Sequence, residues 1–381
     1  MKANKINVLD TTAIRDCTGC AGCSLVCHSS AITMAFDKSG FYRPSIDDEL
    51  CTMCGVCPDV CYKFNDFESL NPFDGSQVLA VTNNYIDDMN AVTTAGVATR
   101  LAEHFFTLGY NVCGVKYDYE KNEVSHDIAS SLADILEFSG SKYMPSDAKD
   151  AFEKLIQEKK KTVVFGLPCQ IHGLRKVIDK KKIADRFILV DFFCAGMMSQ
   201  NVWEKHLEYL KRRFSISKIK KVNFKDKTQG WHKSSLSVVD EAGNRYRQNR
   251  FNDLFYSFLL RRLPYQEACY SCEFRTQVVS SDIRLGDFWG EKYKSWDDGV
   301  ELVTLMNPQG IKAWEEIKDF FSYQICNEQD IYESQKSGSM NTSVKKPQQY
   351  EEVLKAFSSD KTIEEIFKDF KIATIPLGGV Q

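Results

Sequence analysis

The chain has 381 residues, of which 43% are hydrophobic and 27% charged, and its formal net charge is −3. These proportions are typical of a soluble globular protein with two or three domains. The slightly acidic balance excludes the overall basic footprint of a nucleic-acid-binding protein, so no nucleic-acid partner is expected. The longest apolar stretch, residues 187–198, is interrupted by Asp191. It is shorter than the roughly 20 residues that a membrane helix needs, so no membrane span is expected either.

The sequence is rich in cysteine for a protein with this composition. The N-terminal residues MKANKINVLD are polar and lack the apolar run of a secretory signal, which predicts a cytoplasmic location. Thiols stay reduced in that compartment. The fourteen cysteines therefore indicate metal or redox chemistry rather than disulfides.

Eight of these cysteines form two copies of the spacing C-x2-C-x2-C-x3-C, at residues 17–27 and 51–61. This spacing is typical of bacterial ferredoxins with two [4Fe–4S] clusters, in which the fourth cysteine of each run ligates the other cluster. Structural zinc is the alternative, but zinc sites usually combine two separated cysteine pairs. We predict one cluster on Cys17, Cys20, Cys23 and Cys61 and a second on Cys51, Cys54, Cys57 and Cys27.

The residues between the two cysteine runs predict a small β-hairpin. The segment AITMAFDKSGFYRPSID, residues 31–47, contains two short strand-like runs separated by a turn at Lys38, Ser39 and Gly40. A hairpin between two cysteine runs fits an α+β ferredoxin-like module, which we place at residues 1–72.

After a polar linker, strand and helix patterns alternate. Apolar runs predict strands at 78–82, 110–118, 162–166 and 186–193. A helix is expected over 91–109, with an apolar stripe of Val97, Leu101, Phe105 and Leu108 and an end at Gly109. Two more helices are expected at 146–161 and 199–214, beginning at Ser146 and Ser199. This alternation with short connections predicts an α/β domain.

The C-terminal half has a different pattern. From about residue 215 the sequence becomes more β-rich, and residues 234–248 predict a hairpin around Gly243. Helical patterns dominate the end of the chain. The predicted fold is thus an α+β ferredoxin-like module, an α/β flavin-binding domain at 78–310 with a β-rich C-terminal part, and a helical extension at 311–381; the flavin is implied only by the resemblance described below.

Four of the remaining cysteines lie where a further site is expected. Cys169 and Cys194 each follow a predicted buried strand, and Cys269 and Cys272 form a C-x2-C pair. The carboxyl ends of parallel strands share one edge of a sheet, so these thiols can converge there. Buried cysteines that only fill the core are the alternative, and the spacing leaves both open. Cys113 and Cys326 are expected to be packing residues.

Several stretches together resemble the family of coenzyme F420 hydrogenase/dehydrogenase beta subunits. They are TTAGVATRL (93–101), SGSKYMPS (139–146), GLPCQIHGLR (166–175), FFCAGMMS (192–199), YSCEFR (270–275) and SDIRLGDFWG (281–290). The resemblance covers roughly residues 78–310 and implies an iron–sulfur flavoprotein that carries FAD. It also implies a third cluster, on Cys169, Cys194, Cys269 and Cys272.

The resemblance further implies a set of flavin contacts. They are Thr94, Gly96, Ser141, Lys142, Tyr143, Pro168, Gln170, Asp282, Gly286, Asp287 and Phe288. Thr94 and Gly96 stand near a predicted helix start, where free backbone N–H groups favour a phosphate. The loop at Gly286 permits close approach of the backbone to a flat ring.

A few polar residues near these stretches are candidates for catalysis or docking. Lys142 and His172 are candidate proton donors, against a solvated lysine and a structural loop histidine. Trp231 and His232 either line a substrate cleft or belong to the core. The basic run at 215–227 is either a solvated face or a docking surface for an acidic ferredoxin.

These features predict an FAD-dependent iron–sulfur oxidoreductase. Its expected partners are ferredoxin or another low-potential electron donor and a small organic two-electron acceptor, coenzyme F420 or another molecule. No G-x-G-x-x-G fingerprint is present, which disfavours a nicotinamide dinucleotide. The alternative is an electron-transfer subunit of a larger hydrogenase or dehydrogenase, and both a homo-oligomer and a catalytic partner subunit are compatible with the sequence.

Overall fold

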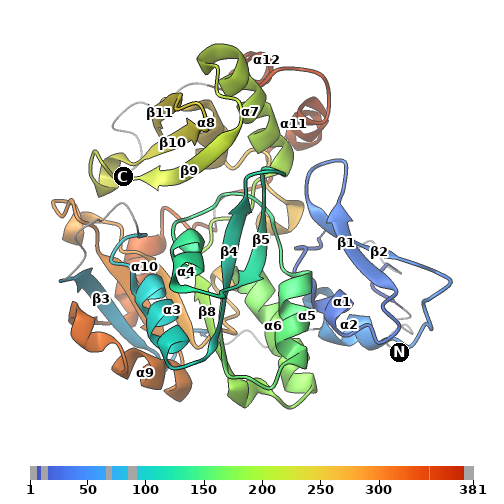
Figure 1. Cartoon of the computed structure of the whole chain (residues 1–381), viewed down its shortest axis with the longest axis vertical. Helices are drawn as coiled ribbons and strands as arrows, with labels where there is room; N and C mark the ends of the chain where they lie inside the picture. Colours follow the sequence, from blue (N-terminus) through green and yellow to red (C-terminus); the bar gives the residue numbers. More distant parts are fainter. Residues whose placement is uncertain (1–6, 10–15, 66–70, 85–91, 343, 373–381) are drawn as a thin grey trace.

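The computed structural model describes residues 7–9, 16–65, 71–84, 92–342 and 344–372. It places a small N-terminal module beside a larger α/β domain, next to helices α5 (Lys149–Gln157) and α6 (Pro168–Lys180) (Figure 1). Of the helices in these ranges, none has the length and apolarity needed to cross a bilayer.

The N-terminal module is built on the predicted hairpin. Strands β1 (Ile32–Phe36) and β2 (Tyr42–Ile46) pair antiparallel. The turn between them is closed by Asp37, whose carboxylate accepts from the backbone N–H of Ser39 at 2.8 Å. Short helices α1 (Gly22–Leu25) and α2 (Val56–Val60) lie within the two cysteine runs. The predicted ferredoxin-like module is confirmed.

A nine-stranded mixed sheet forms the centre of the larger domain. Its order is β14-β3-β13-β12-β8-β7-β4-β5-β6. Four neighbouring strands, β12, β8, β7 and β4, run parallel, and antiparallel strands flank them. The strands are β3 (Gln77–Asn83), β4 (Asn111–Asp118), β5 (Glu123–Ile128), β6 (Ser146–Asp147), β7 (Thr162–Gly166), β8 (Phe187–Phe192), β12 (Ile283–Asp287), β13 (Glu301–Leu305) and β14 (Phe321–Cys326).

Helices cover both faces of this sheet. One face packs on α3 (Val97–Thr107), α4 (Leu132–Phe138) and α9 (Pro308–Glu315). The other packs on α5 and α6, and α10 (Glu328–Gln335) covers its end near β3 and β13. Because successive strand residues point to opposite faces, Val163 and Val164 of β7 belong to different cores. Burial on both faces explains the run of consecutive apolar residues from Val163 to Phe165 in this strand.

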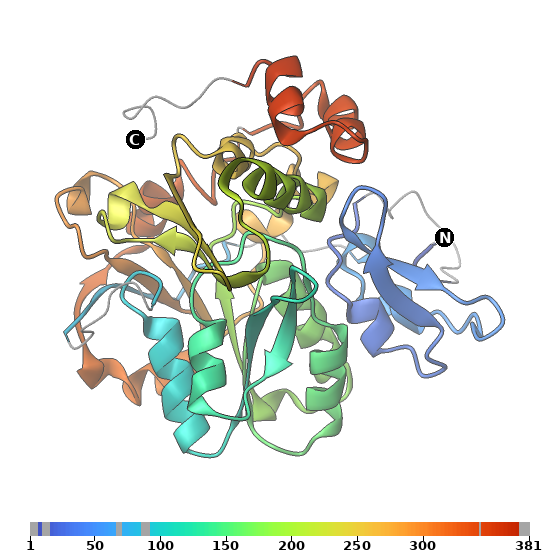
Figure 2. The ribbon, with the colours of Figure 1, turned by 45° about the horizontal axis from the view of Figure 1, so that its top comes forward.

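A second layer stands at one end of the large sheet (Figure 2). It contains an antiparallel sheet of β11 (Arg245–Asn249), β10 (Ser235–Asp240) and β9 (Ile219–Asp226). Around it pack α7 (Gln200–Phe214), α8 (Leu254–Leu260), α11 (Tyr350–Phe357) and α12 (Ile363–Asp369). Ser199 caps α7 by accepting from the backbone N–H of Asn201, as predicted.

Two predicted helices differ from the structure. The helix expected at 91–109 begins only at Val97, because Thr94 and Gly96 have positive φ angles of 49° and 79°. Its residue Leu108 is 56% exposed rather than part of the apolar stripe. Ser146 does not cap a helix; it lies in β6, and its hydroxyl oxygen accepts from Gln170 at 3.0 Å.

The end of the chain is also more than a helical extension. Strand β14 pairs antiparallel with β3 at the edge of the large sheet. Helix α9 packs on the same sheet through Ala313 and Trp314. Buried and exposed residues do not alternate along β14, and the apolar Ile325 is 82% exposed. The sequence of this strand therefore lacks the alternating pattern by which a strand is predicted.

Candidate functional site

The first predicted cluster site is a cavity of about 490 Å³ in the N-terminal module. All four predicted ligands, Cys17, Cys20, Cys23 and Cys61, line it. Three of them come from the first run and one from the second, which is the exchange expected for a ferredoxin. The positive φ of 68° at Gly19 provides the tight turn between Cys17 and Cys20, in a region that favours glycine.

Burial controls the chemistry of these thiols. It raises the pKa of Cys20 to about 11 and that of Cys61 to about 12, and each also lies in the field of Cys17. Burial, with the charges of Cys20, Cys17 and Cys61, raises the pKa of Cys23 well above its ordinary value. Such sulfurs carry negative charge only beside a bound cation, and metal coordination deprotonates a thiol outright. The residues present therefore fit an iron–sulfur cluster.

The second predicted set lies farther out in the module. Burial raises the pKa of Cys57, and the nearby charges of Cys27 and Cys54 raise it further. Cys51 lies next to Met53, with 3.8 Å between their sulfurs, and Cys54 is exposed. Cys57 thus lies near Cys27 of the first run and Cys54 of its own run, and the predicted set reaches the surface at Cys54.

A single metal ion fits these sets less well than a cluster does. Within the described ranges, no three His, Cys, Asp or Glu side chains lie close enough to hold one ion. A zinc ion needs sulfurs about 2.3 Å from one centre. A cubane cluster holds its four thiolates farther apart, at four different irons.

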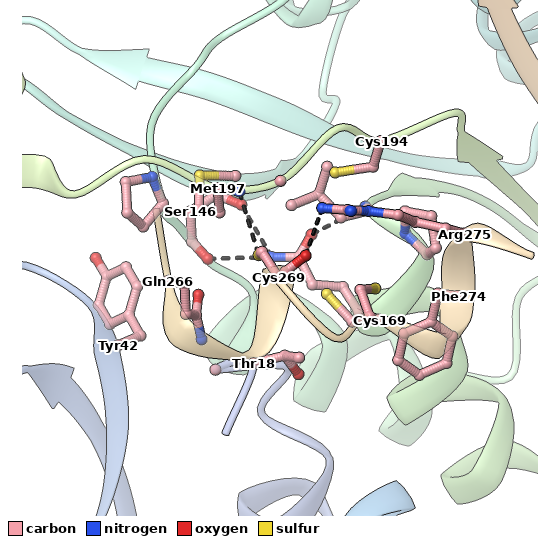
Figure 3. A pocket seen from close by; sticks show the side chains of 17 residues that line it. Thr18, Tyr42, Ser146, Cys169, Cys194, Met197, Gln266, Cys269, Phe274 and Arg275 are labelled. Carbon is pink, nitrogen blue, oxygen red and sulfur yellow. Dashed lines mark hydrogen bonds between the residues drawn. The ribbon is translucent and has the colours of Figure 1, made fainter. Parts of the chain in front are cut away.

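A third set of thiols meets at the carboxyl end of the parallel strands. Cys169, Cys194, Cys269 and Cys272 line one pocket of about 640 Å³. Cys169 follows β7 and Cys194 follows β8, as the topology rule predicts. In Figure 3, labelled cysteines from three separate segments surround the pocket, and Thr18 and Tyr42 of the N-terminal module face it.

Two arginines that the sequence analysis did not assign support this pocket. Arg284 forms a buried two-point ion pair with Asp191, at 2.8 and 2.7 Å, and donates to the carbonyl of Phe274 at 3.1 Å. Arg275 donates to the carbonyl of Ala195 at 2.9 Å and also to that of Cys269. Together they tie the loops of the third set to the sheet. In the sequence, the position of these arginines within the motifs CEFR and SDIRLGD was the indication that they belong to the site.

Burial also raises the pKa values of the third set. That of Cys194 rises to about 11, and Cys269 and Cys272 shift in the same direction. Burial raises the pKa of Cys169 well above its ordinary value, and among the charges that add to this is that of Cys20 in the module. The donor set and its burial fit a third cluster. The thiol set nearest to this pocket is Cys17, Cys20, Cys23 and Cys61 of the module, hereafter the inner site.

A buried polar network lies at the carboxyl end of β12. Lys225 donates to Asp287 at 2.7 Å, Trp231 donates through its indole N–H at 3.1 Å, and the Thr94 hydroxyl donates as well. Burial alone raises the pKa of Asp287, but the charge of Lys225 and these hydrogen bonds outweigh it and lower the pKa. The carboxylate is thus held ionised by its neighbours.

The start of α3 meets the same network. Glu301, paired with Asp287 across β12 and β13, accepts from the backbone N–H of Val97 at 3.2 Å. Lys227 donates to the Thr94 carbonyl at 3.4 Å. Trp231 stacks on Trp289 with ring centroids 4.6 Å apart and planes 2° from parallel. Cations, an aromatic surface and a helix N-terminus therefore meet at one place.

Comparison with known proteins assigns both parts of the chain. Residues 159–330 match the family model described as the C terminus of the coenzyme F420 hydrogenase/dehydrogenase beta subunit, and residues 16–64 match the 4Fe-4S dicluster domain. Through residues 159–330 the chain is similar to the beta subunits of F420 hydrogenase/dehydrogenase. It carries that family's C-terminal domain behind a 4Fe-4S dicluster domain with eight cysteines.

Two individual proteins show the same similarity. Over 187 residues the chain is 21% identical to the F subunit of the F(420)H(2) dehydrogenase of Methanosarcina mazei. That match covers 46% of this chain and spans about half, 51%, of the relative. A chain of the F420-reducing [NiFe] hydrogenase complex from Methanosarcina barkeri, solved as a xenon derivative, is 17% identical with a TM-score of 0.47. It covers 72% of this chain and 94% of its own length.

The structure distributes the predicted flavin contacts over several places. Thr94, Gly96 and Asp287 meet at the polar network, and Gly286 and Phe288 flank Asp287 in the chain. A Cβ on Gly286 would lie 2.8 Å from the ring of Phe193, so this position requires glycine. Sequence analysis did not include Lys225 or Lys227 among these contacts, although both lie in the basic run.

The other predicted contacts lie in three further groups. Ser141, Lys142 and Tyr143 follow α4, and Tyr143 packs on Phe224 and Tyr256. Pro168 and Gln170 line the third pocket. Asp282 lies at the opposite end of β12 from Asp287. It accepts from Arg175 and Asn307, each at 2.8 Å, and from the backbone N–H of Leu189 at 2.7 Å.

The two predicted proton donors have defined partners. The Lys142 ammonium donates to the carbonyls of Glu137, Phe138 and Ser139 at 2.8–2.9 Å, at the end of α4. Burial lowers its pKa to about 7. His172 is buried between the module and the third pocket, bonded to Ser280 at 2.8 Å, and burial lowers its pKa to about 4. A neutral imidazole there is well suited to a structural role.

The basic run and the two packing cysteines can also be placed. Lys225 and Lys227 of the run at 215–227 are buried, so only part of it is a solvated face. Trp231 is fully buried, and His232 beside it is half-buried. Cys113 is buried in the sheet core, and Cys326 packs partly buried against the core near α10, as predicted.

The buried Glu301 predicts an unusual pH dependence of stability. Burial raises its pKa from 4.5 to about 8. Between these values the folded protein holds a proton that the unfolded chain releases, so the unfolding free energy falls as pH rises through this window. Glu301→Gln removes this effect and is expected to raise the unfolding free energy by about 2–4 kcal/mol at pH 8, with little change at pH 5.

Urea unfolding at pH 5, 6.5 and 8 measures this difference. The control is Glu49→Gln at an exposed position of the module, which removes one carboxylate without touching the network. Parallel pH profiles for wild type and Glu301→Gln would contradict a raised pKa at Glu301.

Proposed function

We propose that the protein is an FAD-dependent iron–sulfur oxidoreductase. It exchanges single electrons with a low-potential donor such as ferredoxin and delivers them in pairs to a small organic acceptor. The observation that carries this proposal is the convergence of two thiol sets, one in each domain, with Cys20 beside Cys169. A dicluster domain packed on a third thiol pocket is suited to moving electrons inward.

A third [4Fe–4S] cluster is part of the proposal. Its ligands would be Cys169, Cys194, Cys269 and Cys272, which share one buried pocket. Arg275 and Arg284 are the nearest fixed cations, and their charges lower the pKa of Cys194 against the larger effect of burial. They would therefore favour a bound cluster in its more negative, reduced state. The arginines also hold the loops so that the four sulfurs stay together.

FAD would be held at the network at the end of β12. When bound, a flavin takes up single electrons from clusters and gives two to an organic molecule. Thr94 and Gly96 lie at the start of α3, where backbone N–H groups favour a phosphate. Lys225 and Lys227 supply positive charge, and Asp287 fixes the Lys225 ammonium in place. Lys142, with its lowered pKa, stays a candidate proton donor.

An electron-transfer subunit is the alternative function. The matching relative in Methanosarcina mazei is itself named a subunit of a dehydrogenase, and the matching family model describes a beta subunit. The two functions differ in what the purified chain does alone. Turnover of an organic acceptor without another protein supports the complete enzyme, and dependence on a partner subunit supports the alternative.

The proposal predicts about one FAD per chain, bound without a covalent link. Protein purified anaerobically and reconstituted with FAD is denatured, and the flavin released into the supernatant is identified by chromatography. FAD near a one-to-one ratio is the expected result. Absence of any flavin would overturn the proposed enzyme, and FMN would preserve the electron path but move the phosphate contacts assigned to Thr94 and Gly96.

A further inference from the structure

Helix α1 of the module and helix α6 of the α/β domain touch at two glycines. A Cβ on Gly22 would lie 3.3 Å from the Cα of Gly173. A Cβ on Gly173 would lie only 3.0 Å from the Sγ of Cys20 and 3.3 Å from its Cβ. Such distances are tighter than nine in ten real Cβ contacts. A side chain at Gly173 therefore requires Cys20 and its turn to shift by a few tenths of an ångström.

This contact lies between the inner site of the module and the third pocket. Gly173 follows Cys169 by four residues, about one turn of α6, so both lie on the same side of the helix. Thr18 and Gly19, between Cys17 and Cys20, line the third pocket directly. The ring of Tyr62, which follows Cys61, packs edge-on against Phe274 with centroids 5.1 Å apart.

The module is anchored firmly around this contact. Gln266, from the loop before Cys269, donates to the carbonyl of Cys17. At the hairpin turn, the Ser199 hydroxyl donates to the carbonyl of Ser39 at 2.6 Å, and the backbone N–H of Gln200 donates to that of Gly40 at 3.0 Å. Leu25 of α1 is buried in the same core as α5 and α6. The approach of Cys20 to α6 is therefore a fixed feature of the fold.

We propose that Gly173 is a positioning residue that sets the distance for electron exchange between the Cys17–Cys20–Cys23–Cys61 site and the Cys169–Cys194–Cys269–Cys272 site. Each step moves one electron from the reduced inner site to the oxidised third site, with no bond made and no proton transferred. The exposed site at Cys54 is then the entry point. This inference rests on the proposed function, because it requires a cluster at the third site.

Gly173→Ala tests the inference. Alanine is the better helix former, so the substitution favours α6 itself and acts through its Cβ on Cys20. We expect iron and acid-labile sulfide to stay at the wild-type level. The magnetic coupling between reduced clusters, seen as broadening in the electron paramagnetic resonance spectrum, should weaken. Reduction of the third site after mixing with dithionite-reduced ferredoxin should be slower than in the wild type.

The matched control is Gly338→Ala, where a Cβ meets nothing closer than a carbonyl oxygen at 3.8 Å. It should leave the coupling and the rate unchanged. Gly173→Ala with full iron, wild-type coupling and a wild-type rate would overturn the inference. If Gly173→Ala fails to assemble, Cys169→Ala decides instead. Emptying the third site should remove the part of the broadening that comes from the third cluster and leave the coupling between the two module clusters, and an unchanged spectrum overturns the inference. Wild-type protein with iron for only two clusters would instead reject the proposed third cluster.

Discussion

Replacing Cys272 by alanine is expected to lower the iron content from about twelve to about eight atoms per chain, because three [4Fe–4S] clusters become two. The two remaining clusters should keep their spectra, since their eight cysteines lie in the module and share no ligand with the third pocket. Flavin reduction by reduced ferredoxin should be lost almost completely. The electron path from the module then ends at an empty pocket.

Anaerobic iron and sulfide analysis with stopped-flow flavin absorbance measures both effects. Cys326→Ala is the matched control, since this cysteine is half-buried near α10 and outside all three sets. Cys272→Ala with twelve irons would reject the third ligand set. Eight irons with a normal rate of flavin reduction would show that electrons reach the flavin by another path.

The contrast between the cysteine sets shows what local sequence determines. The ferredoxin runs were predictable because three of the four ligands of each cluster lie within one short segment, and their spacing follows from the geometry of a turn. The third set joins Cys169, Cys194 and Cys272 from distant segments, which only the sheet topology brings together. The residues left a packing role open, and the family resemblance was needed to favour a ligand role.

The buried lysines of the polar network could not be predicted from the local sequence. Lys225 and Lys227 lie in a strongly basic run that has the composition of a solvated face. Both are buried because Lys225 at the end of β9 and Lys227 just after the strand reach Asp287 and Thr94, which come from other parts of the chain. The partners that make a buried lysine tolerable are distant in sequence. No local pattern identifies them.

One motif was predicted as a unit, but the fold divides it. Asp282 and Asp287 both belong to SDIRLGDFWG, yet they stand at opposite ends of β12. Five residues of strand span about 16 Å, so the two carboxylates reach different edges of the sheet. Asp282 binds Arg175 and Asn307 and joins the helices to the sheet, and Asp287 faces the network. Contiguity in sequence gave no indication of this separation.

Lys225→Met is expected to destabilise the α/β domain strongly. Lys225 and Asp287 are both largely buried, and removing the cation leaves Asp287 without its charge partner. Breaking a buried ion pair from one side costs about 3–5 kcal/mol. The proposed flavin site also loses a cation, so flavin retention should fall strongly. Urea unfolding and flavin content after gel filtration measure the two effects.

The double variant Lys225→Met/Asp287→Asn separates stability from binding. Replacing both charges leaves no uncompensated ion, so most of the lost unfolding free energy should return. Flavin retention should stay low, because the cation is still absent. The control is Lys336→Met in the exposed pair with Glu333, where about 0.2–0.5 kcal/mol is expected. Recovery of both stability and flavin in the double variant would show that Lys225 serves only to neutralise Asp287, and the flavin phosphate would then have to be assigned elsewhere.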